Sequence, residues 1–153
     1  MKTILGLTFA CLVALTGCKD MPAVNAPVDF AELESGEHHA YRATNASGVV
    51  LAVREEPNEP KGSLEFWEKA LDNKLRRSGY TRSGAERITT DAGLVGKQLR
   101  YEVLRGGRPT VYWVGVFVTD SRVIVVEAGG DTAFFDAETA KHVNEAFRSL
   151  REG

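Results

Sequence analysis

The stretch Thr110–Val118, TVYWVGVFV, decides the fold that the sequence predicts. Successive side chains of a strand point to opposite faces of a sheet, so the odd and even positions belong to different faces. Both sets are apolar, because Val111, Trp113 and Phe117 alternate with Tyr112, Val114, Val116 and Val118. A strand of this kind is expected to be central and covered on both sides. The stretch Arg122–Ala128, RVIVVEA, repeats the feature after a turn at Asp120-Ser121.

Four more strand-like stretches lie upstream. Leu94–Arg105 has a wet face where polar and apolar residues alternate, and the glycines of Gly106-Gly107 allow the tight turn that joins it to the next strand. Tyr80–Thr89 is a weaker strand. Two shorter runs, His39–Thr44 and Val49–Glu55, flank a turn-forming tetrapeptide and predict a hairpin.

Two helices complete the domain. The first is expected to begin after an N-cap at Ser63 and to end before Gly79, with an apolar stripe of Leu64, Trp67, Leu71 and Leu75. The second follows a cap at Asp131, Thr132 or Asp136, with a stripe of Ala140, Val143, Phe147 and Leu150. The order predicts an α+β fold: an α/β/α sandwich whose mostly antiparallel sheet has about six strands and a helix on each face.

This element order, together with the closing sequence, resembles the PsbP/Mog1-like sandwich, including the DcrB-type bacterial lipoproteins. The resemblance covers roughly His39–Arg151 and includes Phe134, Phe135, Asp136, Phe147, Arg148, Ser149 and Leu150. Members of that group are mostly binding or assembly accessories without a shared catalytic residue. The resemblance therefore implies a fold and no active site.

Bulk properties indicate an ordinary globular protein. The chain has 153 residues, 43% hydrophobic and 26% charged, enough for one domain, which we place at residues 39–153. A formal net charge of −2 provides no global basic field. A nucleic acid is therefore not expected as a partner.

The first 17 residues have the pattern of a signal peptide. Lys2 precedes an uncharged apolar run, Ile4–Leu15, which is too short to span a membrane comfortably, although a retained signal anchor is the alternative. Leu15-Thr16-Gly17-Cys18 then resembles the lipobox of bacterial lipoproteins. In that family, the cysteine receives a diacylglyceryl group and usually an N-acyl chain, and the peptide is cut before it. Cys18 is thus the expected lipid attachment site, and no other cofactor is expected.

The cysteine count supports this interpretation. Cys11 lies inside the signal peptide, which leaves Cys18 as the single cysteine of the mature chain. Lys19 occupies the place where Asp favours inner-membrane retention in enterobacterial lipoproteins, so the resemblance implies an outer-membrane protein facing the periplasm. Residues 18–38, with two prolines and no periodicity, are predicted to form a flexible tether with a short ordered piece at Phe30–Leu33.

Few residues suggest catalytic or metal chemistry. His38 and His39 are weak candidates for metal ligands, because neighbouring residues of a strand point to opposite faces and no other ligand completes the set. No nucleophile elbow is present, and an acylated Cys18 offers no thiol. Glu127, at the end of an apolar run, is either a poised acid or a carboxylate that faces solvent or an arginine.

Arginines are the more suggestive group. Several cluster in the middle third of the chain and define a possible interaction surface: Arg76, Arg77, Arg82, Arg100, Arg105 and Arg108. A mixed, solvated surface is the alternative. Tyr112 and Trp113 are core residues unless one face of the sheet is open, in which case they line a ligand groove.

These observations predict a non-enzymatic envelope lipoprotein: a binding or accessory module anchored in the membrane through Cys18, with an envelope protein as its partner. Two other functions stay open. One is a carrier of a small ligand or metal that uses a pocket on the sheet face, and the other is a hydrolase without a recognisable motif.

Overall fold

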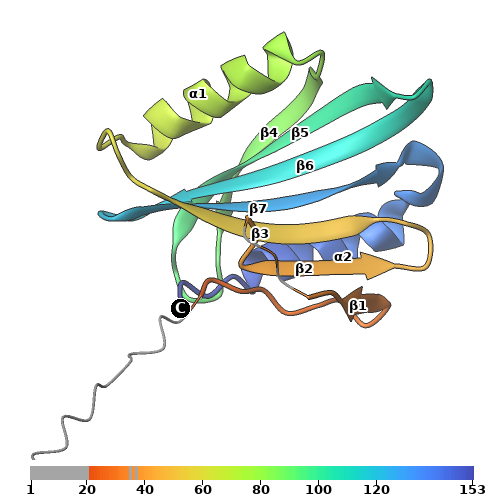
Figure 1. Cartoon of the computed structure of the whole chain (residues 1–153), viewed down its shortest axis with the longest axis horizontal. Coiled ribbons are helices and arrows are strands. Elements are labelled where there is room, and N and C mark those ends of the chain that lie inside the picture. The colour runs from red at the N-terminus through yellow and green to blue at the C-terminus, as the bar shows by residue number, and fades with distance from the viewer. Residues whose placement is uncertain (1–20, 35, 37) are drawn as a thin grey trace, which may run out of the picture.

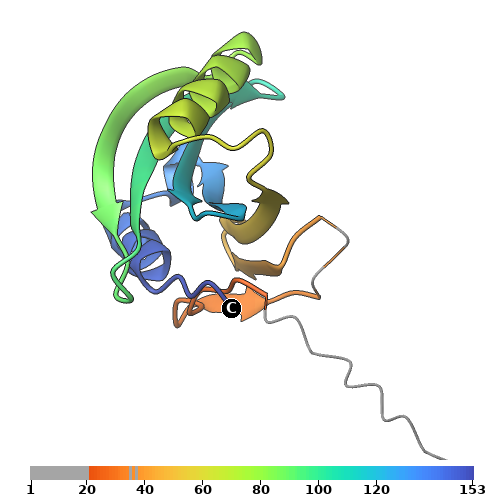
Figure 2. The same cartoon turned by 90° about the vertical axis from the view of Figure 1, so that its left-hand side faces the viewer.

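The computed structural model describes residues 21–34, 36 and 38–153. Seven strands form one antiparallel sheet in the order β1-β2-β3-β7-β6-β5-β4. Helices α1 and α2 pack on opposite faces of the twisted sheet (Figures 1 and 2). The elements are β1 (Phe30–Glu32), β2 (Tyr41–Asn45), β3 (Val50–Pro57), α1 (Leu64–Arg77), β4 (Thr81–Thr89), β5 (Val95–Arg105), β6 (Arg108–Val118), β7 (Arg122–Asp131), the 3-10 helix η1 (Thr132–Phe134) and α2 (Ala137–Arg148).

The predicted α+β sandwich is confirmed, with one strand more than expected. β7 is the middle strand, and β6 lies next to it inside the sheet. On the α1 face, Val114 and Val116 of β6 pack with Leu71 of α1, while Phe117 packs on the other face with Phe147 of α2. The doubly apolar pattern of β6 therefore reflects burial on both faces.

The additional strand corrects the predicted tether. β1 pairs with β2, Phe30 is buried, and Val24 is only 2% exposed. Ala23 and Arg151 form an antiparallel bridge through hydrogen bonds of 3.1 and 2.9 Å. The prediction of a flexible tether over residues 18–38 is therefore wrong for residues 21–29, which pack on the domain, whereas the short ordered piece predicted at Phe30–Leu33 is confirmed as β1. This segment is ordered because it pairs with, and is buried against, residues that are far away along the chain, and local composition does not reveal such contacts.

Helix boundaries follow the capping signals. Ser63 accepts a hydrogen bond from the Phe66 N–H at the start of α1, and Gly79 after its end has φ +88°. Asp136 is the cap of α2, since its side chain accepts from the Thr139 N–H at 2.8 Å. The Gly106-Gly107 turn has φ of +56° and +78°, as the hairpin prediction requires.

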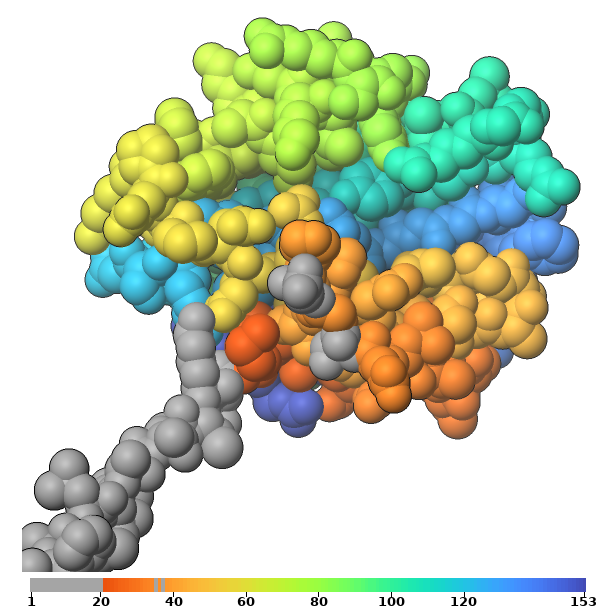
Figure 3. All heavy atoms as spheres, viewed as in Figure 1, coloured from red at the N-terminus to blue at the C-terminus, as the bar shows by residue number. Residues whose placement is uncertain are grey.

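Coverage of the sheet by α1 is incomplete. α1 packs over β4, β5 and β6. On the same face, β2, β3 and part of β7 lie beyond its reach. Figure 3 shows β7 in blue between α1 and the orange β2–β3 region. This open half of the sheet provides the hollow that is described below.

Candidate functional site

The turns at the two ends of the sheet divide the molecule into two poles. The bridge between Ala23 and Arg151 brings both ends of the described chain to the pole of the β4–β5 and β6–β7 turns, where Asp91 N–H donates to Arg148 O. The opposite pole holds the β2–β3 turn, the β5–β6 turn, η1 and the C-terminus of α1. We call this opposite pole the distal end (right-hand side of Figure 1).

Four of the six candidate arginines lie at the distal end. Arg76 and Arg77 end α1, and Arg105 and Arg108 flank the β5–β6 turn. All four are exposed. Arg105 reaches back toward α1, donating to the Tyr80 hydroxyl and lying 5.7 Å from the centre of that ring. These arginines therefore place positive charge on both sides of the gap between α1 and the hairpin.

The other two candidate arginines are bound within the molecule. Arg82 lies 3.4 Å from Glu68 and 3.5 Å from Asp72. Arg100 pairs with Glu86 and lies 4.5 Å from the centre of the Trp113 ring, on the α2 face. Both side chains form ion pairs within the domain, and neither adds to the group of exposed arginines at the distal end.

Exposed apolar side chains gather at the same end. Among the described residues, the three most exposed large hydrophobic side chains are Val28, Leu104 and Phe134, at 94%, 71% and 53%. Leu104 lies at the tip of the β5–β6 hairpin, Phe134 lies in η1, and Val28 lines a hollow with Phe134. A further hollow of about 520 Å³ runs between Leu104, Thr132 and the end of α1 at Gly79. Leu104 is next to Arg105 in the β5–β6 hairpin, whereas the hollow of Val28 and Phe134 is lined by the carboxylates of Asp29, Asp136 and Glu138. Exposed large apolar groups are typical of protein-binding surfaces.

The open half of the sheet forms a second hollow, which we call the sheet-face groove. It has a volume of about 300 Å³, and its lining includes Val50, Ala52, Arg42, His39, Tyr112 and Glu127. Tyr112 thus lines a groove on one face, as the sequence allowed, whereas Trp113 packs against Phe135 on the other. Figure 3 shows β7 in blue on the floor, below α1 and above β2–β3.

A polar triad closes one end of the groove. Glu127 accepts from Arg54 Nε at 3.0 Å and from the Tyr112 hydroxyl at 2.7 Å. Burial raises the pKa of Tyr112 far above its usual range, and the neighbouring Glu127 carboxylate raises it further. The Tyr112 hydroxyl is therefore a protonated donor at neutral pH. Of the alternatives for Glu127, the structure shows a carboxylate facing an arginine.

A second tyrosine–carboxylate pair lies beneath α1. The Tyr101 hydroxyl donates to Asp72 at 2.8 Å in the core, and burial together with that bond raises the pKa of Tyr101. Tyr80 packs edge-on against Tyr101, with ring centres 6.2 Å apart. This cluster fixes α1 on the sheet and offers no ionised nucleophile.

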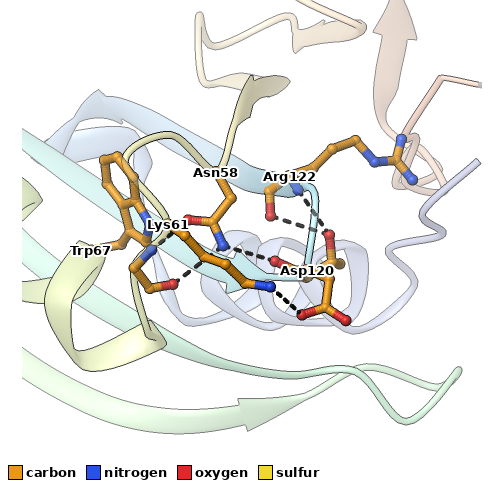
Figure 4. Close-up of polar contacts among 7 residues, drawn as sticks. Asn58, Lys61, Trp67, Asp120 and Arg122 are labelled. Carbon is orange, nitrogen blue, oxygen red and sulfur yellow. Dashed lines mark hydrogen bonds and ion pairs between the residues drawn. The ribbon is translucent and has the colours of Figure 1, made fainter.

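A polar node that the sequence did not reveal lies away from the distal end, at the pole of the β6–β7 turn (Figure 4). Asn58 is 4% exposed; its amide nitrogen donates to Gly62 O at 3.2 Å and Thr119 O at 2.9 Å. Its amide oxygen accepts from Gly62 N at 2.9 Å and Trp67 Nε1 at 2.7 Å. Asn58 therefore joins the loop before α1 to the β6–β7 turn, where Lys61 and Asp120 also pair at 3.1 Å. Only the turn-forming composition of this loop could have drawn attention to it.

The remaining candidate residues are not brought together. Cys18 lies outside the described residues. His38 is exposed, while His39 lines the groove. Within residues 21–34, 36 and 38–153, no three His, Cys, Asp or Glu side chains are grouped so that they could hold a metal ion. The described helices include none that is long and apolar enough to cross a membrane.

Comparison of the fold with solved structures gives clear likenesses at low sequence identity. The cyanobacterial PsbP protein CyanoP of Synechocystis matches with a TM-score of 0.59 and 14% identity, over 97% of this chain and 99% of CyanoP. The fold is PsbP-like. LpqN of Mycobacterium tuberculosis, described as involved in cell envelope biogenesis, matches with a TM-score of 0.65 and 13% identity, over 88% of this chain and 83% of LpqN.

A third likeness is to PA94 of Pseudomonas aeruginosa, a protein of unknown function, with a TM-score of 0.60 and 10% identity over 88% of this chain and 86% of PA94. A scan against protein-family models finds no match, and neither does a search of curated protein sequences. At these sequence identities, the likenesses show a shared fold and do not show a shared function, which has to be argued from the geometry of the surface.

Proposed function

We propose that this chain is a non-catalytic binding module of the bacterial cell envelope, anchored by lipid on Cys18 and engaging a partner through its distal end. The observation that carries the proposal is the gathering of Val28, Leu104 and Phe134 at one pole together with exposed arginines. An envelope role also fits the likeness to LpqN, which is described as involved in envelope biogenesis.

The proposed anchor sets the orientation of the domain. Cys18 precedes Met21 by three residues, and three residues span at most about 10 Å when fully extended. The described chain begins at the pole of the Ala23–Arg151 bridge. A lipid on Cys18 would therefore hold this pole close to the bilayer and leave the distal end pointing away from it. Lys19, by its resemblance to sorting signals, favours the outer membrane.

The distal end suits an acidic protein surface. Arg77, Arg105 and Arg108 pair with no described carboxylate, and the Arg76–Asp72 contact is loose, at 3.9 Å. Arginine combines charge with planar hydrogen bonding, so these residues can bind carboxylates in a partner while Leu104 and Phe134 bury apolar area. The interaction is expected to weaken as salt is raised.

Absence of catalysis is part of the proposal. The two buried hydroxyl–carboxylate pairs, at Tyr112 and Tyr101, both have tyrosine pKa values raised by burial. A raised pKa keeps the hydroxyl protonated and makes it a poor nucleophile at neutral pH. A hydrolase function therefore finds no support in these pairs.

Site-specific photo-crosslinking in intact cells tests the docking surface. A photoreactive residue at Leu104 should give one discrete adduct with an envelope protein, and the same residue at Lys141, exposed on α2, should not. Replacing Arg76, Arg77 and Arg108 by glutamate should abolish the Leu104 adduct. Equal labelling from both positions, or an adduct that survives the charge reversals, would contradict the proposal.

The carrier function is the second candidate, because the structure contains a groove with polar and apolar walls. A metal cargo has no support among the described residues, in which no suitable ligand group is found. A small organic ligand is the remaining possibility.

A further inference from the structure

We infer that the sheet-face groove is a binding site for a small soluble monoanion with a flat apolar body, such as an aromatic carboxylate. The groove shares Arg105 with the distal docking surface, whereas Arg42 and the apolar floor belong to the groove alone. The inference rests on the shape of the groove, on the charges around it and on the apolar side chains at its floor.

The groove exists because small residues occupy the part of the sheet that α1 does not cover. At the floor, Gly129 of β7 lies opposite Val50 of β3, and Ala52, two residues further along β3, lies opposite Glu127. A Cβ added at Gly129 would lie 3.0 Å from Val111 O and 3.5 Å from the Tyr112 ring, so a larger residue would crowd this floor. The volume of about 300 Å³ is at the lower end of the range for small-molecule sites.

The charge around the groove is positive. Arg42 and Arg105 line it together with His39, and Glu127 is the one carboxylate in this lining. Glu127 is already neutralised, because Arg54 lies 3.0 Å away and the Tyr112 hydroxyl donates to it at 2.7 Å. Among the described residues, no carboxylate then competes with a ligand for Arg42 and Arg105.

Neither of these two arginines forms an ion pair with a described carboxylate. Arg105 donates to the neutral hydroxyl of Tyr80 and so keeps its charge. The Arg42 guanidinium makes no ion pair or side-chain hydrogen bond with the residues that the structure describes. An anion held between them would gain charge-assisted hydrogen bonds that water supplies less well.

The apolar side chains at the floor of the groove favour a ligand with an apolar body. Val50 is a large hydrophobic residue that remains 36% exposed, and it lines the groove together with Ala52 and the Tyr112 ring. An inorganic anion would leave this area wet, and a neutral hydrocarbon would leave the arginines without a partner. A ligand with an anionic group and an apolar body can bind the arginines and cover the apolar floor at the same time.

The triad of Arg54, Glu127 and Tyr112 limits the length of the ligand. It separates the groove from a smaller apolar hollow of about 180 Å³, lined by Trp67 and Leu71 under α1. The groove therefore favours a short, flat molecule over a long chain.

Binding of 2-naphthoate tests the inference. The protein is the mature chain, residues 18–153, with Cys18→Ser so that no lipid is attached. Titration followed by amide NMR should shift the signals of Ala52, Gly129 and Gly130 and leave those of α2 unchanged. The neutral analogue 2-naphthalenemethanol and the small anion acetate should each bind at least about tenfold more weakly.

Charge variants identify the groups that hold the anion. Arg42→Gln and Arg105→Gln should each raise the Kd for 2-naphthoate about tenfold, because each removes a charge-assisted hydrogen bond. Arg148→Gln, an exposed arginine of α2, is the matched control and should leave the Kd unchanged.

Three results would overturn the inference: equal binding of the neutral analogue, shifts that spread over the whole surface, or insensitivity to both arginine substitutions. Binding to phosphatidylglycerol vesicles without any response to 2-naphthoate would identify a lipid head group as the anion and would also overturn it. Loss of the Leu104 crosslink alone would contradict the proposed docking surface and leave the groove untouched.

Discussion

Replacing Asn58 by alanine should destabilise the domain more than any other single exchange of an amide side chain at its surface or in its loops. The Asn58 side chain makes four hydrogen bonds, of 2.7, 2.9, 2.9 and 3.2 Å, from a site that is 4% exposed. At about 1 kcal/mol net for each bond, the loss would reach about 4 kcal/mol. Water can replace part of it, because Gly62, Trp67 and Thr119 are only half-buried. We therefore expect about 3 kcal/mol, or a Tm lower by about 9 °C for a domain of this size.

Chemical denaturation followed by tryptophan fluorescence measures this free energy, and Trp67 reports directly because its indole N–H bonds to Asn58. Asn73→Ala is the matched control, since Asn73 is exposed in the middle of α1, where alanine is the better helix former. It should change the free energy of unfolding by less than about 0.5 kcal/mol. An Asn58→Ala loss below about 1 kcal/mol would refute the reasoning, because four buried bonds could not then be worth the value assigned to them.

Two further perturbations probe the frame that holds the surfaces. The Thr139 N–H holds the pKa of the Asp136 cap below its usual range, so Asp136 stabilises the fold above about pH 4 and ceases to do so as the pH falls through the folded-state pKa. The stability advantage of wild type over Asp136→Asn should therefore shrink between pH 5 and pH 2 in thermal melts, and an unchanged advantage would contradict this origin. Gly96→Ala should lower the free energy of unfolding by at least about 2 kcal/mol, because the added Cβ would lie 2.5 Å from the Phe117 ring. Gly84→Ala should lower it by less than about 1 kcal/mol, because the atom nearest to its Cβ is 3.7 Å away, and urea denaturation of both variants measures the difference. Equal losses for the two glycines would be evidence against this packing.

Local patterns in the sequence were sufficient for the layers of the fold. The alternation in Thr110–Val118 predicts burial on both faces, and β6 lies between α1 and α2 as a result. The caps at Ser63 and Asp136 and the positive φ of Gly79 follow from rules that operate within a few residues. Such rules need no knowledge of the remote chain.

Long-range pairing is what the sequence could not provide. Ala23 bridges to Arg151, and β1 has only three residues, so neither has a periodic signal. Glu127 was expected to face solvent or an arginine, but nothing local identifies Arg54, 73 residues away. Asn58 lies between Pro57 and Pro60 in a stretch that reads as a loop, and its buried role depends on a turn at Thr119.

The candidate surfaces depend on the same long-range arrangement. The arginine cluster was expected from composition, yet only the sheet register separates the distal Arg105 and Arg108 from Arg82 and Arg100, which are bound within the molecule. Whether Tyr112 would line a groove depended on how far α1 reaches across the sheet. Amphipathic stripes define the buried side of a helix and not the width of sheet that it covers.

Attachment through Cys18 is the claim on which the orientation and the envelope role depend. Intact-mass measurement of the protein extracted from membranes tests it most directly, with Cys18→Ala as the control. We predict a mature chain that begins at Cys18 and carries a diacylglyceryl group with an N-acyl chain, while the variant retains residues 1–17 and no lipid. A mature protein of unmodified mass, or a Cys18→Ala variant that is cut and modified like the wild type, would contradict the account.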